Sequence, residues 1–407
     1  MTVVFVNRFC HPDHSATSQI VSDLASGLAM QGMPVAMVAS RQLYDDPDAR
    51  LAARDHWQGV DIHRVWTSRF GRARILGRMV DYLTFYCSLP WVLLRLLRRG
   101  DVVVAKTDPP LISLVVAPVA WLRGAVLVNW LQDVFPEVAV SLGEPSVPAW
   151  FAWLLRQFRN ASLRHAHMNV AIGARMAEYL VGQGARPDRV QLIPNWAHEQ
   201  SIHPMASAQS RLRQSLGLLD RFVVGYSGNL GRAHDIDTLF DAVQRLAGEQ
   251  RIVFLITGGG NGYLLLQQRC RQAGLMNIQF LPYQPLATLA DSMAASDLHL
   301  VSLRPELEGK IVPSKFYGIA AAERSVAFIG DPDGELARLI AANACGFSVP
   351  CDRGDLLADG IMHLAAAPDD CRAQGRRARQ LLDSTFSREL AHQQWHTLLL
   401  RLSASRR

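Results

Sequence analysis

The chain has 407 residues, enough for between two and three domains at about 150 residues each, and a formal net charge of +6. Hydrophobic residues make up 49% and charged residues 19%, which excludes a disordered, collagen-like or coiled-coil chain. Nearly all of the cationic side chains are arginines, and the three lysines are Lys106, Lys310 and Lys315. Because the arginines are scattered along the chain, we expect no nucleic-acid partner, but an anionic small molecule or an anionic membrane surface.

Short apolar runs alternate with helical patterns through the first half of the chain, which predicts an α/β fold with a parallel sheet. The predicted strands of this half are Val3–Asn7, Pro34–Ala39, Asp61–Val65, Val102–Lys106, Ala125–Leu131, Met168–Ile172 and Val190–Ile193. A helix is predicted over Ser18–Gln31, ending at Gly32. The first residues read as a strand and not as a signal peptide, and the longest apolar run, 110–122, is too short to cross a bilayer.

A second alternating unit follows a linker predicted over 194–210, which has two prolines and no clear period. Its predicted strands are Phe222–Tyr226, Ile252–Thr257, Ile278–Leu281, Leu298–Ser302, Val326–Ile329 and Phe347–Val349. We therefore expect two doubly wound, Rossmann-like domains, 1–200 and 201–384. The tail Ser387–Leu402 has the pattern of an amphipathic helix, and 385–407 is expected to pack back on the first domain.

Residues 67–100 combine basic and aromatic side chains, a composition typical of helices that lie on an anionic membrane surface. These side chains are Arg69, Arg72, Arg74, Arg78, Arg95, Arg98 and Arg99, with Phe70, Tyr82, Phe85, Tyr86 and Trp91. The alternative is two ordinary domain helices, each with one buried and one solvated face. Membrane contact is the favoured interpretation.

Ligands of open parallel sheets bind beyond the carboxyl ends of the strands, so the loops there are the candidate sites. The loop after Phe222–Tyr226 contains Gly228 and Gly231, which let the backbone approach an anion at a helix N-terminus. The alternative is a tight turn in which Asp235 caps the helix. Three glycines at 258–260, after the next strand, permit another close approach but are weak by themselves.

The loop 303–318 is the third candidate, because Pro313 and Ser314 begin a predicted helix there. Lys310 and Lys315 lie in this loop, and compact ammonium donors suit a phosphate. Two nearby glutamates, Glu306 and Glu308, could accept hydrogen bonds from ribose or sugar hydroxyls, or could be solvated loop charges.

Five segments together resemble the family 4 glycosyltransferases, in the branch that builds bacterial exopolysaccharide, capsule and O-antigen. They are residues 9–19, Trp130-Leu-Gln-Asp-Val-Phe-Pro-Glu137, residues 193–197, Ser227-Gly-Asn-Leu-Gly231 and Val312-Pro-Ser-Lys-Phe-Tyr-Gly318. The resemblance implies the GT-B fold, with two domains facing a central cleft, and sugar transfer with retention at the anomeric carbon. It also implies a UDP- or GDP-sugar donor, no tightly bound metal or other cofactor, and a lipid-linked saccharide acceptor. Such an enzyme would be cytoplasmic and peripheral on the inner face of the cytoplasmic membrane.

The family pattern places the donor site on the loops of the second domain. The donor residues expected on this basis are Ser227, Gly228, Asn229, Gly231, Arg232, Gly258, Gly259, Glu306, Glu308, Gly309, Lys310, Ser314, Lys315 and Tyr317. Asn229 and His234 stand where many members have an arginine and a lysine. The family's two glutamates would fall on Lys310 and Gly318. We therefore expect Lys315, helped by Arg232 and the Ser314 amide, to hold the diphosphate, with His234 beside it in the catalytic site.

The acceptor is expected to meet the first domain, where Asp133 is the candidate to orient a hydroxyl or act as base, with a structural cap as the alternative. Four residues of the first loop could line the same site: His11, His14, Ser15 and Thr17. Asp331-Pro-Asp333 suggests a metal motif only superficially, and we interpret it as a turn that caps a helix.

Two other functions remain open from the sequence: a nucleotide-sugar 2-epimerase of the same fold, and a degenerate homologue that binds nucleotide-sugar without turnover. A dinucleotide-dependent dehydrogenase is disfavoured, because residues 225–231 do not give Gly-x-Gly-x-x-Gly.

Overall fold

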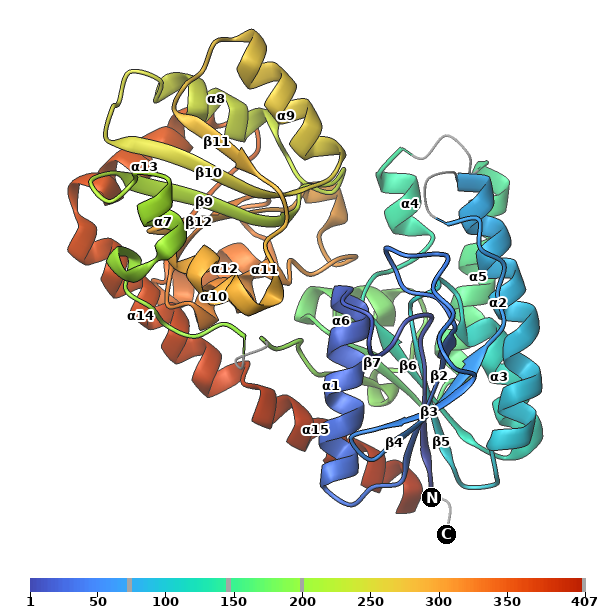
Figure 1. The fold of residues 1–407 in the computed structure, drawn as a ribbon. Helices are drawn as coiled ribbons and strands as arrows, with labels where there is room; N and C mark the ends of the chain where they lie inside the picture. The colour runs from blue at the N-terminus through green and yellow to red at the C-terminus, as the bar shows by residue number, and fades with distance from the viewer. Residues whose placement is uncertain (72–74, 144–147, 198–200, 405–407) are drawn as a thin grey trace. The chain divides into compact units, whose positions relative to one another are not determined.

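The computed structural model describes residues 1–71, 75–143, 148–197 and 201–404, and divides into two compact units. Unit 1 comprises Met1–Pro194 and Ala391–Arg407, and unit 2 comprises Asn195–Leu390. Each unit has a sheet of parallel strands covered by helices (Figure 1). The predicted fold class is confirmed: both units are Rossmann-like.

Unit 1 is built on an eight-stranded sheet in the order β3-β4-β2-β1-β5-β6-β7-β8. The strands are β1 (Val3–Val6), β2 (Val35–Ser40), β3 (Arg54–Trp57), β4 (Val60–Val65), β5 (Val102–Lys106), β6 (Val126–Leu131), β7 (Met168–Ala171) and β8 (Val190–Leu192). The sequence analysis missed β3, the antiparallel edge strand, because its residues are polar and largely exposed. β1 lies between β2 and β5, so the strand order reverses between β1 and β5. The loops that follow these two strands therefore begin close to each other.

The helices of unit 1 cover this sheet and bury apolar side chains against it. They are α1 (Ala16–Met30), α2 (Ile75–Leu96), α3 (Ser113–Arg123), α4 (Glu137–Ser141), α5 (Ala149–His165) and α6 (Ala174–Gly182). The basic and aromatic stretch forms one helix, α2, and not two, because Pro90 is tolerated inside it. Among the residues described, no helix has the length and apolar character needed to cross a bilayer.

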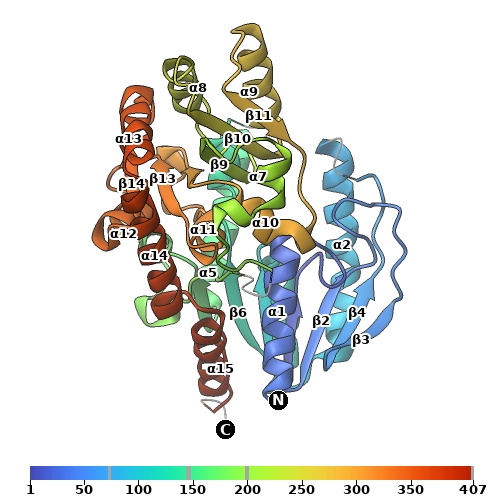
Figure 2. The same ribbon diagram turned by 60° about the vertical axis from the view of Figure 1, so that its left-hand side comes forward.

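Unit 2 is built on a six-stranded parallel sheet in the order β11-β10-β9-β12-β13-β14. Its strands are β9 (Phe222–Asn229), β10 (Ile252–Gly259), β11 (Ile278–Leu281), β12 (Leu298–Ser302), β13 (Ser325–Ile329) and β14 (Gly346–Val349). The helices are α7 (Arg211–Ser215), α8 (Asp237–Arg245), α9 (Asn261–Gln272), α10 (Leu289–Ala294), α11 (Lys315–Ala321), α12 (Glu335–Asn343), α13 (Gly354–Ala366) and α14 (Pro368–Thr385). Figure 2 shows α13 and α14 beside β13 and β14. The strand order reverses between β9 and β12, so the loops that follow these two strands are neighbours.

The last helix, α15 (Arg388–Ala404), carries the chain out of unit 2 and packs on unit 1. Trp395 of α15 is fully buried, with its ring centroid 4.8 Å from that of Trp130 on β6. His392 on the same helix lies 3.3 Å from the carboxylate of Asp23 on α1. The tail is therefore part of the core of unit 1.

Replacing Trp395 by alanine is expected to lower the free energy of unfolding of unit 1 by about 3–5 kcal/mol, because it leaves a cavity against Trp130. Leu400→Ala, on the exposed side of α15, is the control and should change it by less than about 0.5 kcal/mol. Urea denaturation followed by far-UV circular dichroism measures both. Equal midpoints for the two variants would show that α15 adds nothing to unit 1.

Candidate active site

Three side chains of unit 2 meet beyond the carboxyl ends of β9 and β12: Lys315, His234 and Tyr226. The Lys315 Nζ lies 3.3 Å from the His234 Nε2 and 5.2 Å from the centroid of the Tyr226 ring. Lys315 begins α11, His234 lies in the loop after β9, and Tyr226 is within β9. Residues 89 positions apart in sequence thus form one cluster at the point where the strand order reverses.

His234 is held in a single tautomer. Its Nδ1 lies 2.6 Å from the carbonyl oxygen of Ser302, which can only accept, so Nδ1 carries the hydrogen. Burial, together with the neighbouring Lys315 charge, lowers the pKa of His234 to about 4, so the ring is neutral at pH 7. Its Nε2 is then free to accept a hydrogen bond from the Lys315 ammonium. A neutral histidine orients the cation here without adding a second positive charge.

Burial also lowers the pKa of Lys315, to about 8, so the side chain is mostly cationic at pH 7. A weakly solvated ammonium binds an anion more strongly than a fully hydrated one. Gly228 lies directly beside it with φ +115°, and a Cβ there would stand 3.3 Å from the Lys315 Cε. The glycine therefore provides both the backbone conformation and the room for the lysine.

The glycines after β10 have a structural role that the sequence left open. A Cβ on Gly258 would lie 2.0 Å from the carbonyl oxygen of Gly228, so any side chain would force β9 and β10 apart. The Leu230 amide donates to the Gly259 carbonyl at 2.8 Å, and the Leu230 carbonyl accepts from Gly262 at 2.8 Å. The loop after β9 is therefore fixed against β10 and α9. Asp235 also caps α8, since its carboxylate accepts from the Asp237 amide at 3.0 Å.

The loop after β12 uses two of its charged residues in its own structure. The Glu308 carboxylate accepts from the Glu335 amide at 2.8 Å, at the start of α12. The Lys310 ammonium donates to the carbonyl of Glu306 at 2.5 Å. The Glu306 carboxylate lies 3.8 Å from the Arg304 guanidinium. Glu306 and Lys315 are therefore better placed than Glu308 and Lys310 to meet a ligand.

The other predicted donor residues divide into exposed and buried sets. Asn229, Arg232 and Ser314 are exposed at the loop ends, and Arg232 forms no ion pair with the residues that the structure describes. Tyr317 is buried instead, with its ring 5.4 Å from that of Phe386. Of the remaining predicted residues, Ser227 and Gly231 are half-buried and Gly309 is buried.

Unit 1 has a comparable cluster at the carboxyl ends of β5 and β6. Lys106, fully buried, donates to the carbonyl of Thr17 at 2.6 Å and lies 4.8 Å from the Trp130 ring. Burial lowers its pKa to about 7, and raises the pKa of Asp133 to about 6. The Oδ1 atom of Asp133 is shielded from solvent and has no hydrogen-bond partner among the described residues. The sequence analysis listed Lys106 but gave it no role. A lysine at the end of an apolar strand could have indicated a buried charge at the carboxyl edge of the sheet.

The first loop of unit 1 holds most of the predicted acceptor-side residues in internal contacts. The His11 ring stacks on Trp57, with centroids 4.1 Å apart and planes 10° apart. The hydroxyl of Ser15 donates to Asp13 at 2.5 Å, and that of Thr17 donates to Asp108 at 3.2 Å. His14 is exposed. Asp133 is thus the residue of this set with an unsatisfied polar atom.

No group of three or more histidine, cysteine or acidic side chains within the described ranges could hold a metal ion. Asp331 and Asp333 form a turn, in which the Asp331 carboxylate accepts from the Asp333 amide at 2.9 Å.

Two family models match the chain. Residues 15–196 match a glycosyl transferase 4-like domain, and residues 208–381 match the glycosyl transferases group 1. The protein belongs to the family 4 glycosyltransferases. This membership decides against the epimerase and the dehydrogenase considered above.

Curated relatives of this glycosyltransferase come from bacteria. The probable glycosyltransferase WbjE of Pseudomonas aeruginosa is 26% identical over 290 residues, 71% of this chain and 72% of the relative. A putative colanic acid biosynthesis glycosyl transferase, WcaI of Escherichia coli (strain K12), is 25% identical over 350 residues, 81% of this chain and 83% of the relative.

Solved structures share the GT-B fold at low sequence identity. Sucrose-phosphate synthase from Thermosynechococcus elongatus is 16% identical with a TM-score of 0.76, and all of both chains is covered. HepE of Anabaena in complex with UDP is 16% identical with a TM-score of 0.73, covering 98% of this chain and 100% of HepE. At these identities the likeness shows the fold alone.

The Lys315 pKa makes anion binding by the glycosyltransferase depend on pH. The cation is present below pH about 8 and is lost above it, so affinity for UDP as a diphosphate probe should fall by up to about tenfold per pH unit above pH 8. Calorimetric titrations between pH 7 and 10 measure this. Lys315→Arg, which does not lose its charge in this range, should remove the fall. The same decline in that variant would assign it to another group.

Proposed function

We propose that this glycosyltransferase moves a sugar, with retention at the anomeric carbon, from a nucleotide-diphosphate sugar to a lipid-linked saccharide in bacterial surface polysaccharide synthesis. Unit 2 would bind the donor and unit 1 the acceptor. The observation that carries the proposal is the Lys315 ammonium, held by neutral His234 at the edge of the sheet where ligands of such folds bind. HepE, solved with UDP and with UDP-glucose, supports a UDP-sugar before a GDP-sugar.

The proposed chemistry breaks the bond between the anomeric carbon and an oxygen of the β-phosphate, and forms a bond from that carbon to the acceptor hydroxyl oxygen. Negative charge develops on the departing diphosphate. A fixed cation at that place stabilises the transition state more than the ground state. Lys315 supplies this cation, and the exposed Arg232 and the Ser314 amide assist it. Glu306 would bind sugar or ribose hydroxyls.

Asp133 is proposed to take the proton of the acceptor hydroxyl or to orient that hydroxyl. A carboxyl with a pKa of about 6 is ionised at pH 7 yet basic enough to share a proton. Its unpartnered Oδ1 offers an acceptor at no cost in existing hydrogen bonds.

The donor assignment is tested by thermal-shift and calorimetric screening against UDP, GDP, ADP, dTDP and their sugars, with and without EDTA. One nucleotide should bind selectively, with no effect of EDTA, and Lys315→Ala should weaken binding by roughly tenfold or more.

Asp133→Asn should keep donor affinity but lower turnover by about 100-fold or more and remove the acid limb of the pH–rate profile near pH 6. Binding by the wild type without turnover on any acceptor would favour the degenerate homologue, and no binding at all would refute the donor assignment.

A membrane-facing surface on unit 1 supports the lipid-linked acceptor and a position on the inner face of the cytoplasmic membrane. Helix α3 contacts α2 on one side and α5 on the other. Their exposed side chains include several large aromatics: Trp91 (66% exposed), Trp121 (83%), Trp150 (69%), Trp153 (58%) and Phe158 (50%). Exposed arginines lie among them, at Arg95, Arg123 and Arg164.

The charge of this surface has one sign. Among all the residues of α2, α3 and α5, the single acidic side chain is Asp81, which is buried and paired with Arg8 at 3.3 Å. Phe85 and Tyr86, which the sequence analysis counted toward the membrane surface, point elsewhere: Phe85 is buried and Tyr86 donates to the Pro110 carbonyl. Arg72 and Arg74 lie outside the described residues. The aromatic and basic side chains that remain suit an anionic bilayer interface.

Flotation with lipid vesicles tests this surface. The protein should bind vesicles that contain phosphatidylglycerol more tightly than vesicles of phosphatidylcholine alone, and binding should weaken as salt rises. The double variant Trp121→Ala/Trp153→Ala should lose at least about tenfold in affinity. Met276→Ala, an exposed apolar change in unit 2, is the control. Equal binding by the double variant and the control would contradict the proposal.

A further inference from the structure

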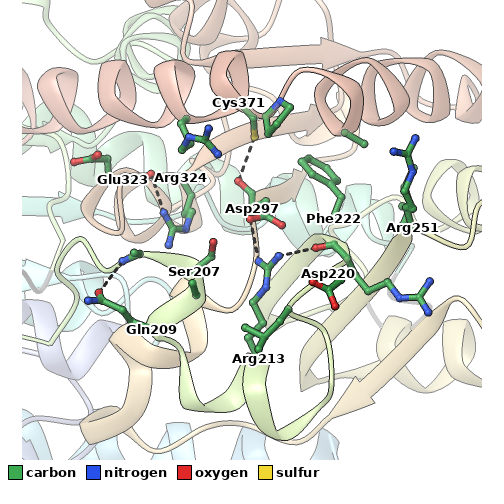
Figure 3. Close-up of a pocket in the computed structure, with 18 of the residues that line it drawn as sticks. Ser207, Gln209, Arg213, Asp220, Phe222, Arg251, Asp297, Glu323, Arg324 and Cys371 are labelled. Carbon is green, nitrogen blue, oxygen red and sulfur yellow. Dashed lines mark hydrogen bonds and ion pairs between the residues drawn. The ribbon is translucent and has the colours of Figure 1, made fainter.

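A cavity of about 930 Å³ opens in unit 2 at the edge of the sheet opposite Lys315. Its lining includes residues at the amino ends of the strands: Phe222 of β9, Ile252 of β10, and Asp297 and Arg324 just before β12 and β13. Helix α14 contributes Cys371 to the cavity (Figure 3). Because β9 is eight residues long, roughly 23 Å separates this edge from the donor loops. The cavity is therefore independent of the donor site.

Arginines dominate the charge of this cavity. The charged residues in its lining are Arg213, Arg221, Arg251, Arg324, Arg372, Arg376, Asp220, Glu249, Asp297 and Glu323. Arg213 and Asp297 pair with each other at 2.9 Å, and Asp297 also accepts from the Val223 amide at 2.9 Å. This pair is internal to the fold. Arg372 is also paired, with Asp369 at 2.5 Å. The remaining charged residues of the lining, four arginines and three acidic side chains, leave a surplus of one positive charge.

Two kinds of arginine are available to a ligand. Arg324 is held at the cavity wall because its guanidinium donates to the carbonyls of Met205 and Ala294, while its Nε is shielded from solvent without a partner among the described residues. Arg251 and Arg376 are exposed, and neither forms an ion pair with any residue the structure describes. A fixed guanidinium and two exposed ones in the same lining are suited to phosphate oxygens.

Apolar side chains also line the cavity: Phe222, Met362, Ala365 and Ala366. The volume is within the range of cavities that hold small organic molecules, about 300–1,000 Å³. A cavity lined by both arginines and apolar side chains fits a ligand that has both an anionic and an organic part.

We propose that this cavity is a second ligand site of the protein, which binds a phosphate monoester with a compact organic group, either a sugar phosphate or a nucleoside monophosphate. The phosphate would contact arginines of the lining, and the organic group would lie against Phe222. This proposal does not depend on the donor assignment, because it concerns the other edge of the sheet.

Calorimetric titration of the full chain with glucose 6-phosphate, UMP and inorganic phosphate, at 150 mM salt, tests the site and distinguishes the two sources of the ester. We expect one ester to bind at a single site more tightly than inorganic phosphate. Arg251→Ala and Arg376→Ala should each weaken this binding by roughly tenfold. Arg271→Ala removes an exposed arginine of α9 outside the cavity and should leave it unchanged. Thermal unfolding of each variant confirms that it is folded.

Three results would overturn the proposal. They are no binding of either ester, binding that Arg251→Ala and Arg376→Ala leave intact, and binding lost in Lys315→Ala, which would place the ester in the donor loops. Equal affinity for inorganic phosphate and the esters would remove the organic part of the assignment, since the apolar side chains would then contribute nothing.

Discussion

The ammonium of Lys315 beside a neutral histidine is the interaction that joins the loops after β9 and β12 of unit 2. The Ser302 carbonyl fixes the tautomer of His234, which leaves Nε2 facing Lys315, while Tyr226 lies beneath the charge. The arrangement favours a glycine at position 228, because its φ is +115° and a Cβ there would stand 3.3 Å from the Lys315 Cε. Strand order, loop conformation and charge thus converge on one cation, and a second cation at position 234 would repel it.

Unit 1 repeats this physical solution with different neighbours. Lys106, like Lys315, lies over an aromatic ring and has its pKa lowered by burial. Here the ammonium binds the Thr17 carbonyl and so fixes the start of α1 to the end of β5. In a chain with three lysines, two are buried at carboxyl edges of the sheets, where arginine's larger planar group would fit less well.

The two edges of the unit 2 sheet differ in chemistry for a topological reason. Parallel strands place all of their carboxyl ends at one edge, where glycine loops and Lys315 gather. The amino ends lie at the other, where helix termini and α14 leave the arginine-lined cavity. In unit 1, too, different groups lie in different places. Asp133 lies at the carboxyl edge of the sheet, and the exposed tryptophans and arginines lie on the outer helices. The proposed binding of small anions and the proposed contact with lipid therefore draw on separate surfaces.

The sequence by itself determined the alternation of strands and helices and the loops after Tyr226 and Ser302, because periodicity, glycine and proline act locally. It also singled out Lys315 as a candidate site residue. It missed β3, divided α2 in two, and could not show that Glu308 caps α12 or that Tyr317 packs against Phe386. The cavity was also invisible, since it needs Arg324 to bond the carbonyl of Met205, 119 residues away. Such contacts depend on where the chain returns in space, and only the tertiary structure decides which polar groups it leaves free for a ligand.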